Sequence, residues 1–250
     1  MKMAPDQLYR EIIGRERSFA ILIDPDKVEK QEIILLLKDI PSFTTHLFVG
    51  GSTVKSGKCE RVVKELKKHS SLPIILFPGD YSQVTPEADG ILFLSLVSGE
   101  NPEYLIGQQI KSAKAIIASK LEVISTAYVL IDGGKETAVQ RVSETLPIPQ
   151  LEVERIVSIC LASQLAGKKI IYLEAGSGAL ISVHPNIIQA VKKEVNLPII
   201  VGGGLRTEKE IEACYQAGAN LVVVGTAFEE EFKQKSHENI SRVNTYSNSR

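Results

Sequence analysis

The chain has 250 residues, 44% of them hydrophobic, and a formal net charge of −1 with a sequence pI near 6.5. This length and apolar content suit one large α/β domain, and the lack of a basic excess argues against a nucleic-acid partner. The three cysteines stand singly, and no apolar run approaches the ~18 residues that span a bilayer. We therefore expect a soluble, cytoplasmic protein whose contact with a membrane is at most transient.

Short β-branched and aromatic runs alternate with longer amphipathic segments, the pattern of repeated strand and helix units around a parallel sheet. Most of the short runs are continuously apolar, so both faces of the sheet should be covered. The predicted strands are 19–24, 46–51, 73–78, 90–95, 123–131, 170–174, 198–203 and 221–225. The predicted helices are 28–40, 54–69, 102–118, 151–166, 185–195, 207–218 and 227–236.

Two connections depart from this regular alternation. The third, residues 79–89, is short and rich in turn residues, so a loop or short turn should replace a helix there. The segment 132–150 is longer than a simple turn and should lie over the barrel mouth or at a subunit contact, with Leu146 to Leu151 as a candidate contact of a homo-oligomer. We predict a modified TIM (βα)8 barrel with the third helix replaced, formed by residues 1–236 as a single domain, and a flexible polar tail over 237–250.

Small and polar residues gather where the predicted strands end, which in a TIM barrel is the face that carries the chemistry. Glycine turns follow strands six, seven and eight, and each could simply be a tight turn. Three such turns at consecutive strand ends favour a phosphate site, because converging backbone N–H groups bind phosphate and glycine permits close approach. The glycines concerned are Gly176, Gly178, Gly202, Gly203, Gly204 and Gly225.

Two carboxylates also stand at strand ends. Asp24 would be costly at the mouth unless it bound something, and Mg²⁺ held by Asp24 and a hydroxyl such as that of Ser52 would fit. Glu174 beside the glycine turn is a candidate general base for an alcohol, with Tyr172 on the same side of the strand. The plainer interpretation of Glu174 is a salt bridge to a barrel lysine. His184 lies close to the mouth, but a loop histidine is more often a bystander.

The segments ILIDPDK, LFVGGS, STAYVLIDGGKET, YLEAGSGA, VGGGLRT and VVVGTAFE, in this order, closely resemble the geranylgeranylglyceryl phosphate synthase family. The resemblance implies a prenyltransferase on a modified TIM barrel. It would join the C3 hydroxyl of sn-glycerol 1-phosphate to geranylgeranyl diphosphate, with Mg²⁺ as cofactor. Two positions depart from some relatives: Leu22 replaces a lysine, and Thr226 replaces an asparagine.

The resemblance also assigns residues. It places the metal at Asp24 and Ser52, and Glu174 fits the proposed base. Phe93 and Tyr128 are our hypothesis for an apolar groove that holds the prenyl chain. The glycerol phosphate site would consist of Tyr172, Leu173, Glu174, Ala175, Gly176, Ser177, Gly178, Gly203, Gly204, Gly225 and Thr226.

Three alternatives stay open on sequence grounds. The first is the same reaction with another prenyl chain length, since groove depth sets the length. The second is a metal-independent sugar-phosphate isomerase or lyase on the same barrel, which would also use a glycine cradle. The third is a barrel without catalysis that binds a phosphorylated ligand or a partner protein.

Overall fold

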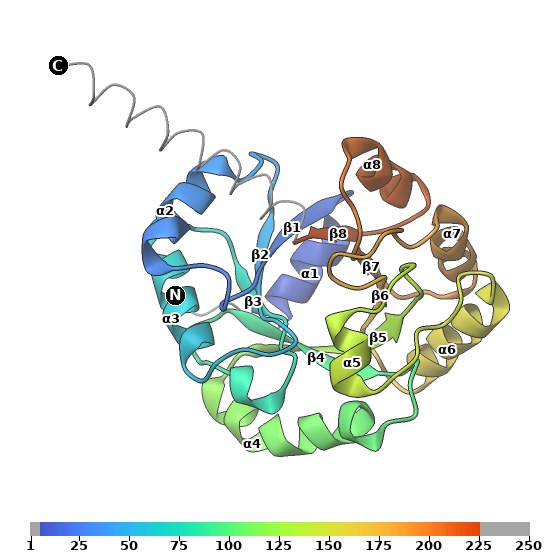
Figure 1. The fold of residues 1–250 in the computed structure, drawn as a ribbon, viewed down its shortest axis with the longest axis horizontal. Helices are drawn as coiled ribbons and strands as arrows, with labels where there is room; N and C mark the ends of the chain where they lie inside the picture. The colour runs from blue at the N-terminus through green and yellow to red at the C-terminus, as the bar shows by residue number, and fades with distance from the viewer. Residues whose placement is uncertain (1–5, 226–250) are drawn as a thin grey trace.

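The structure, a computed structural model, describes residues 6–225. Eight parallel strands pair in chain order, and β8 also pairs with β1, so the sheet closes into a barrel (Figure 1). This closure confirms the predicted TIM-type fold. The strands are β1 (Ser18–Ile23), β2 (His46–Val49), β3 (Ile74–Leu76), β4 (Gly90–Leu96), β5 (Glu122–Leu130), β6 (Ile170–Glu174), β7 (Ile199–Gly202) and β8 (Leu221–Val224).

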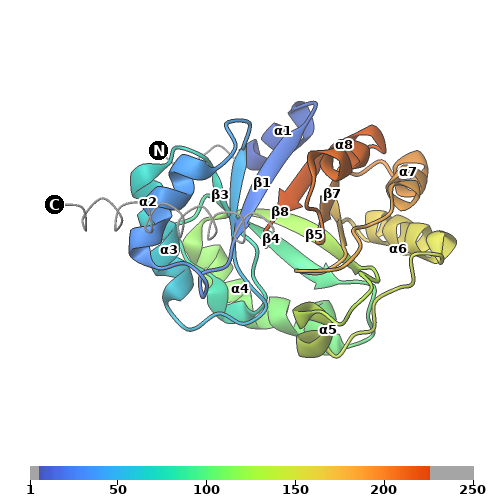
Figure 2. The same ribbon diagram turned by 45° about the horizontal axis from the view of Figure 1, so that its top comes forward.

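Helices surround the strands (Figure 2). They are α1 (Gln7–Gly14), α2 (Lys30–Asp39), α3 (Lys58–His69), α4 (Gln108–Ser119), α5 (Ala138–Ser143), α6 (Val153–Leu165), α7 (Pro185–Glu194) and α8 (Glu208–Gln216). Two short turns complete the set: η1 (Tyr81–Gln83) is a 3₁₀ turn, and η2 (Glu103–Gly107) is π-helical and leads into α4. Within residues 6–225, no helix has both the length and the apolar character needed to cross a membrane.

The third connection contains only η1, which confirms that a short turn replaces the third helix. Helices α1 and α5 were not predicted. Helix α5 lies inside the long segment 132–150, where Thr137 caps it by accepting the N–H of Gln140 at 3.4 Å. The helix expected over 227–236 and the tail expected over 237–250 lie outside the described residues.

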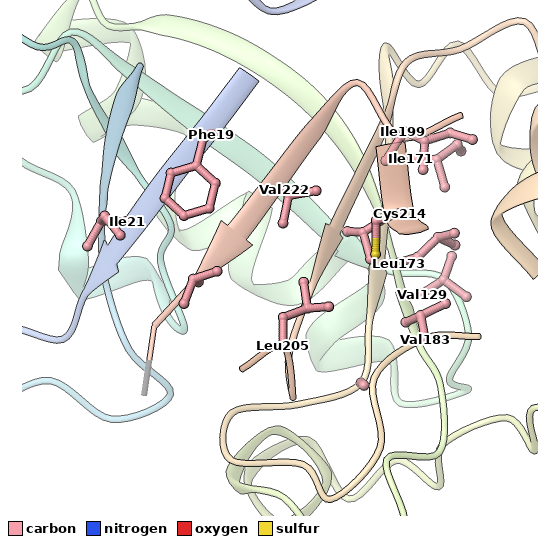
Figure 3. Packing of buried hydrophobic residues seen from close by; sticks show 14 of the residues in the cluster. Phe19, Ile21, Val129, Ile171, Leu173, Val183, Ile199, Leu205, Cys214 and Val222 are labelled. Carbon is pink, nitrogen blue, oxygen red and sulfur yellow. The ribbon is translucent and has the colours of Figure 1, made fainter. Parts of the chain in front are cut away.

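Alternation along the strands builds two apolar layers. One set of side chains fills the barrel interior, including Ala20, Phe48 and Tyr172, which are fully buried. The other set packs between the strands and the surrounding helices, as in Phe19 and Val222, and Figure 3 shows part of this outer layer. Because both faces are covered, the strands carry the continuous apolar runs that revealed them in the sequence.

Helix α1 closes the N-terminal end of the barrel. Its Leu8 and Ile12 are fully buried with the interior side chains. The backbone N–H groups of Leu8 and Tyr9 donate to the Glu122 carboxylate at 2.9 and 2.8 Å, so an acidic side chain satisfies the start of the helix. With this end of the barrel covered, the end open to ligands is the opposite one, where the strands reach their C-termini.

Candidate active site

A cavity of about 470 Å³ lies at the C-terminal ends of the strands. Its interior wall is aromatic: the Phe77 and Tyr172 rings stack with centroids 5.1 Å apart, and the Tyr128 ring lies 5.3 Å from that of Tyr172. The cavity brings most of the residues singled out in the sequence to one mouth. Those that line it are Asp24, Ser52, Phe93, Tyr128, Tyr172, Glu174, Ser177, Gly178, Gly203, Gly204 and Gly225.

Three of the proposed site residues that the structure describes do not line this cavity. Leu173 and Ala175 alternate with Glu174 and are fully buried in the outer apolar layer, so only their backbone can serve the site. Gly176 acts through its N–H, which donates to the Oε1 atom of Glu174 at 2.7 Å. Thr226 lies outside the described residues.

Glu174 is the last residue of β6 and is only 5% exposed. Burial raises its pKa from 4.5 to about 7, while the Gly176 N–H and the nearby Tyr172 hydroxyl lower the pKa in part. None of the described lysines or arginines lies within ion-pair distance of this carboxylate. The salt-bridge interpretation therefore lacks its partner, and a carboxylate with a pKa near neutrality can take up a proton from a bound alcohol.

The Tyr172 hydroxyl borders this carboxylate. A Cβ atom at Gly202 would lie 2.4 Å from the hydroxyl and 3.0 Å from the Oε2 atom of Glu174, so the bare backbone of Gly202 makes room for both groups. The hydroxyl is fully buried and has no partner that meets hydrogen-bond geometry among residues 6–225. An unpaired buried hydroxyl is costly, which makes it available to a ligand that enters the cavity.

The glycine turns after β6 and β7 form a cradle. Gly176, Gly178, Gly203 and Gly204 have φ angles of +95°, +69°, +83° and +71°, a region that side chains disfavour. A Cβ atom at Gly203 would lie 2.4 Å from Glu174 Oε1 and 2.5 Å from the Gly176 nitrogen. The N–H groups of Gly178, Gly203 and Gly204 donate to no acceptor in the described part of the chain. They are therefore available to bind an anion at the mouth.

Gly225 differs from these glycines. Its φ lies outside the left-handed region, and a Cβ atom there would make only ordinary contact with Leu22, at 3.5 Å. Among residues 6–225, neither strain nor crowding requires glycine at this position. Its assignment to the phosphate site remains a prediction.

Asp24 follows β1 at another part of the rim, with 23% of its side chain exposed. Its Oδ1 atom accepts the Asp26 N–H at 3.0 Å, and the Lys27 Nζ atom lies 3.7 Å from Oδ2. A Cβ atom at Gly51 would lie 3.0 Å from Oδ1, so the end of β2, which continues into Ser52, packs against this carboxylate.

These donors suit Mg²⁺, which commonly takes one or two protein oxygens and leaves its other positions to water and phosphate. Within residues 6–225, no cluster of three or more histidine, cysteine or acidic side chains could hold a metal ion. Water and substrate phosphate would have to supply the other ligands. The assignment of Mg²⁺ to the Asp24 carboxylate and the Ser52 hydroxyl stays a prediction.

Sequence reasoning missed two cations at the mouth. The Arg206 guanidinium donates to the carbonyl oxygens of Ala179 at 2.6 Å and Gly204 at 3.1 Å, which ties the glycine turn after β6 to the one after β7. The Lys135 Nζ atom would lie 3.4 Å from a Cβ atom at Gly178. The only available signal for Lys135 was its place in the segment expected over the mouth. His184, by contrast, is exposed, and its Nδ1 atom accepts the Asn186 N–H at 3.2 Å as the cap of α7.

The cavity also extends sideways from the mouth, into the region where a full third helix would lie in a regular barrel. Val84 next to η1 and Ile116 on α4 line this extension, together with Phe93 and Tyr104. Tyr128 lies at the junction and is 5% exposed. The absence of a third helix thus leaves an apolar space beside the polar mouth.

Comparison with known proteins gives consistent matches. The sequence model of the PcrB family matches residues 11–244. The chain is 50% identical over 219 residues to a geranylgeranylglyceryl phosphate synthase of Zunongwangia profunda, covering 87% of this chain and 94% of that one. It is 48% identical over 217 residues to the synthase of Flavobacterium johnsoniae, covering 86% and 89%.

Among solved structures, the chain resembles the (S)-3-O-geranylgeranylglyceryl phosphate synthase of Thermoplasma acidophilum in complex with its substrate sn-glycerol-1-phosphate. The TM-score is 0.83 at 33% sequence identity, and the match covers 91% of this chain and 92% of that chain.

Proposed function

Because this chain belongs to the PcrB family, together with the geranylgeranylglyceryl phosphate synthases it resembles, we propose that it is a prenyltransferase that makes geranylgeranylglyceryl phosphate. The C3 hydroxyl of sn-glycerol 1-phosphate attacks C1 of geranylgeranyl diphosphate. An ether bond forms, the bond from C1 to diphosphate breaks, and the hydroxyl proton passes to the enzyme. The observation that carries this proposal is the buried Glu174 beside a cradle of unpaired glycine N–H groups.

The acceptor is held at the cradle. Its phosphate accepts hydrogen bonds from the N–H groups of Gly178, Gly203 and Gly204, which converge from two loops. This anchor directs the glycerol end toward Glu174 and the unpaired Tyr172 hydroxyl. Glu174, with a pKa of about 7, is about half ionised at pH 7, and its ionised form is basic enough to remove the proton as the ether bond forms.

The donor occupies the rest of the mouth. Asp24 and Ser52 would hold Mg²⁺, and the ion would supply positive charge to offset that of the diphosphate leaving group. The prenyl chain lies in the lateral extension past Phe93 and Tyr128. That extension is lined largely by apolar side chains and runs sideways out of the barrel, features that favour a prenyl donor over the small substrate of a sugar-phosphate isomerase.

Assembly and location are also part of the proposal. Leu146 and Leu151 are 78% and 96% exposed on the segment before α6, a degree of apolar exposure that favours burial against a second copy. We expect a homo-oligomer that works in the cytoplasm and contacts a membrane only transiently.

The test is a transfer assay with labelled sn-glycerol 1-phosphate and a series of prenyl diphosphates. We expect label in the organic phase with geranylgeranyl diphosphate, loss of transfer with EDTA, and recovery with Mg²⁺. A shorter or longer preferred donor would correct the chain length alone. Failure of every donor, with glycerol phosphate still bound, would reject prenyl transfer in favour of the isomerase or the non-catalytic barrel.

A further inference from the structure

The phosphate cradle described above is made of neutral backbone. The N–H groups of Gly178, Gly203 and Gly204 carry partial charge only, and Leu22 beside Gly225 adds none. A phosphate monoester carries a charge of about −1.5 to −2 at neutral pH, and a full positive charge nearby strengthens its binding. Among the described residues that line the cavity, the cations are Lys27, Lys135 and Arg206.

Two of these cations already interact with other groups of the protein. Lys27 lies 3.7 Å from Asp24, on the side of the mouth where the metal would bind. Arg206 donates to the Ala179 and Gly204 carbonyl oxygens and approaches that of Leu180 at 3.5 Å. Its guanidinium therefore holds the two glycine turns together, with three of its five N–H donors directed at backbone oxygens.

Lys135 remains. Its Nζ and Cε atoms would lie 3.4 and 3.9 Å from a Cβ atom at Gly178, so the ammonium group stands directly over the turn after β6. No hydrogen-bond or ion-pair partner of its side chain is found in the part of the chain that the structure describes. An ammonium group without a partner, next to unpaired amide N–H groups, is a composite anion site.

The loop that carries Lys135 is locked onto the cradle. The Gly133 carbonyl oxygen accepts the N–H groups of Leu180 at 2.8 Å and Ile181 at 3.1 Å. A Cβ atom at Gly176 would lie 2.3 Å from the Thr137 side chain, so this loop and the glycine turn are in close contact. The backbone of Lys135 is therefore held near Gly178 by backbone hydrogen bonds at Gly133 and by packing of the Thr137 side chain.

We propose that Lys135 binds the phosphate group of the glycerol phosphate acceptor and is the one side-chain cation of that site among residues 6–225. This assignment rests on the proposed function, since it concerns the same cradle. The Lys135 ammonium group acts as a point charge on a flexible side chain, and it binds a phosphate oxygen that the backbone N–H groups have already positioned. In the proposed function, the diphosphate of the donor would instead bind on the side of Asp24 and Lys27.

The test measures binding of sn-glycerol 1-phosphate to the full chain by titration calorimetry, without any prenyl donor. Lys135→Met should weaken binding about 10- to 100-fold, the usual loss for a hydrogen bond to a charged group. Lys135→Arg should restore most of the affinity, because it restores the charge. Lys114→Met, which removes an exposed lysine of α4, is the matched control and should bind like the wild type.

Steady-state kinetics supply the second readout. Lys135→Met should raise the KM for glycerol phosphate and leave the KM for the prenyl diphosphate unchanged. Wild-type affinity in Lys135→Met would overturn the assignment, and so would a higher KM for the donor with intact acceptor binding. A wild type that binds glycerol phosphate but makes no lipid would refute prenyl transfer, while weaker binding by Lys135→Met would still support the phosphate contact.

Discussion

Glu174 and Asp24 both stand where a parallel strand reaches the barrel mouth, but their surroundings differ. Glu174 is 5% exposed, has no described cation within ion-pair distance, and has a pKa raised to about 7 by burial. Asp24 keeps 23% of its side chain exposed, accepts a backbone N–H, and faces Lys27 at 3.7 Å. These environments suit Glu174 to accept a proton and Asp24 to hold a cation.

The largest expected effect follows from removing the proton acceptor. Glu174→Gln keeps the size of the side chain and its ability to accept the Gly176 N–H, but it cannot take up a proton. We expect kcat to fall about 10²- to 10⁴-fold while the KM for glycerol phosphate changes little. Glu154→Gln on the exposed surface of α6 is the control. A loss of kcat below tenfold would remove Glu174 from the base role.

Burial of Glu174 also predicts a dependence of stability on pH. Because its pKa in the folded state is raised, its contribution to stability is fully present below the unfolded value of 4.5 and is lost as the pH rises through about 7. The lost contribution is about 3 kcal/mol. The difference in unfolding free energy between wild type and Glu174→Gln, measured in urea, should shift by this amount in favour of glutamine between pH 4.5 and 8. A constant difference would contradict the raised pKa.

The cation site is tested by two neighbouring aspartates. Asp24→Asn should raise the Mg²⁺ concentration needed for half-maximal activity by about 10- to 100-fold or more. Removal of a group that only hydrogen-bonds a metal ligand already weakens metal affinity by this factor. Asp26→Asn should leave this concentration unchanged, because the Asp26 carboxylate accepts the Lys55 N–H at 3.2 Å and faces Lys58 at 3.4 Å. Equal metal requirements in both variants would argue against Asp24.

The smallest effect concerns the hydroxyl beside Glu174. Tyr172→Phe removes a buried hydroxyl that makes no hydrogen bond of acceptable geometry within residues 6–225. Stability should therefore stay the same or rise by up to about 1 kcal/mol, while the KM for glycerol phosphate should rise about fivefold. Tyr215→Phe is the contrast, since that hydroxyl donates to the Ser18 carbonyl oxygen at 2.7 Å and its loss should destabilise the fold. Thermal unfolding separates the two; a destabilised Tyr172→Phe would mean that its hydroxyl is already paired.

The sequence predicted the elements that follow a repeating apolar pattern and the charged side chains that are costly to bury. Continuous apolar runs revealed the strands, and the short third connection revealed the missing helix. Helix α1 was not predicted, because it spans only 8 residues and its N-cap residue Asp6 makes no side-chain hydrogen bond that caps the helix. Glu174 stood out because a carboxylate ends an apolar strand, but its raised pKa depends on burial in three dimensions. Arg206 could not be foreseen, since it binds backbone carbonyl oxygens, which carry no residue-specific signal.

The most direct test of the central claim is the pH dependence of the single-turnover rate at saturating substrate, from about pH 5.5 to 8.5, for wild type and Glu174→Gln. If a buried carboxylate removes the proton, the wild-type rate should rise about tenfold per pH unit at first and level off at or above pH 7, while the residual rate of Glu174→Gln stays flat. A flat wild-type profile, or the same rise in Glu174→Gln, would show that Glu174 is not the base.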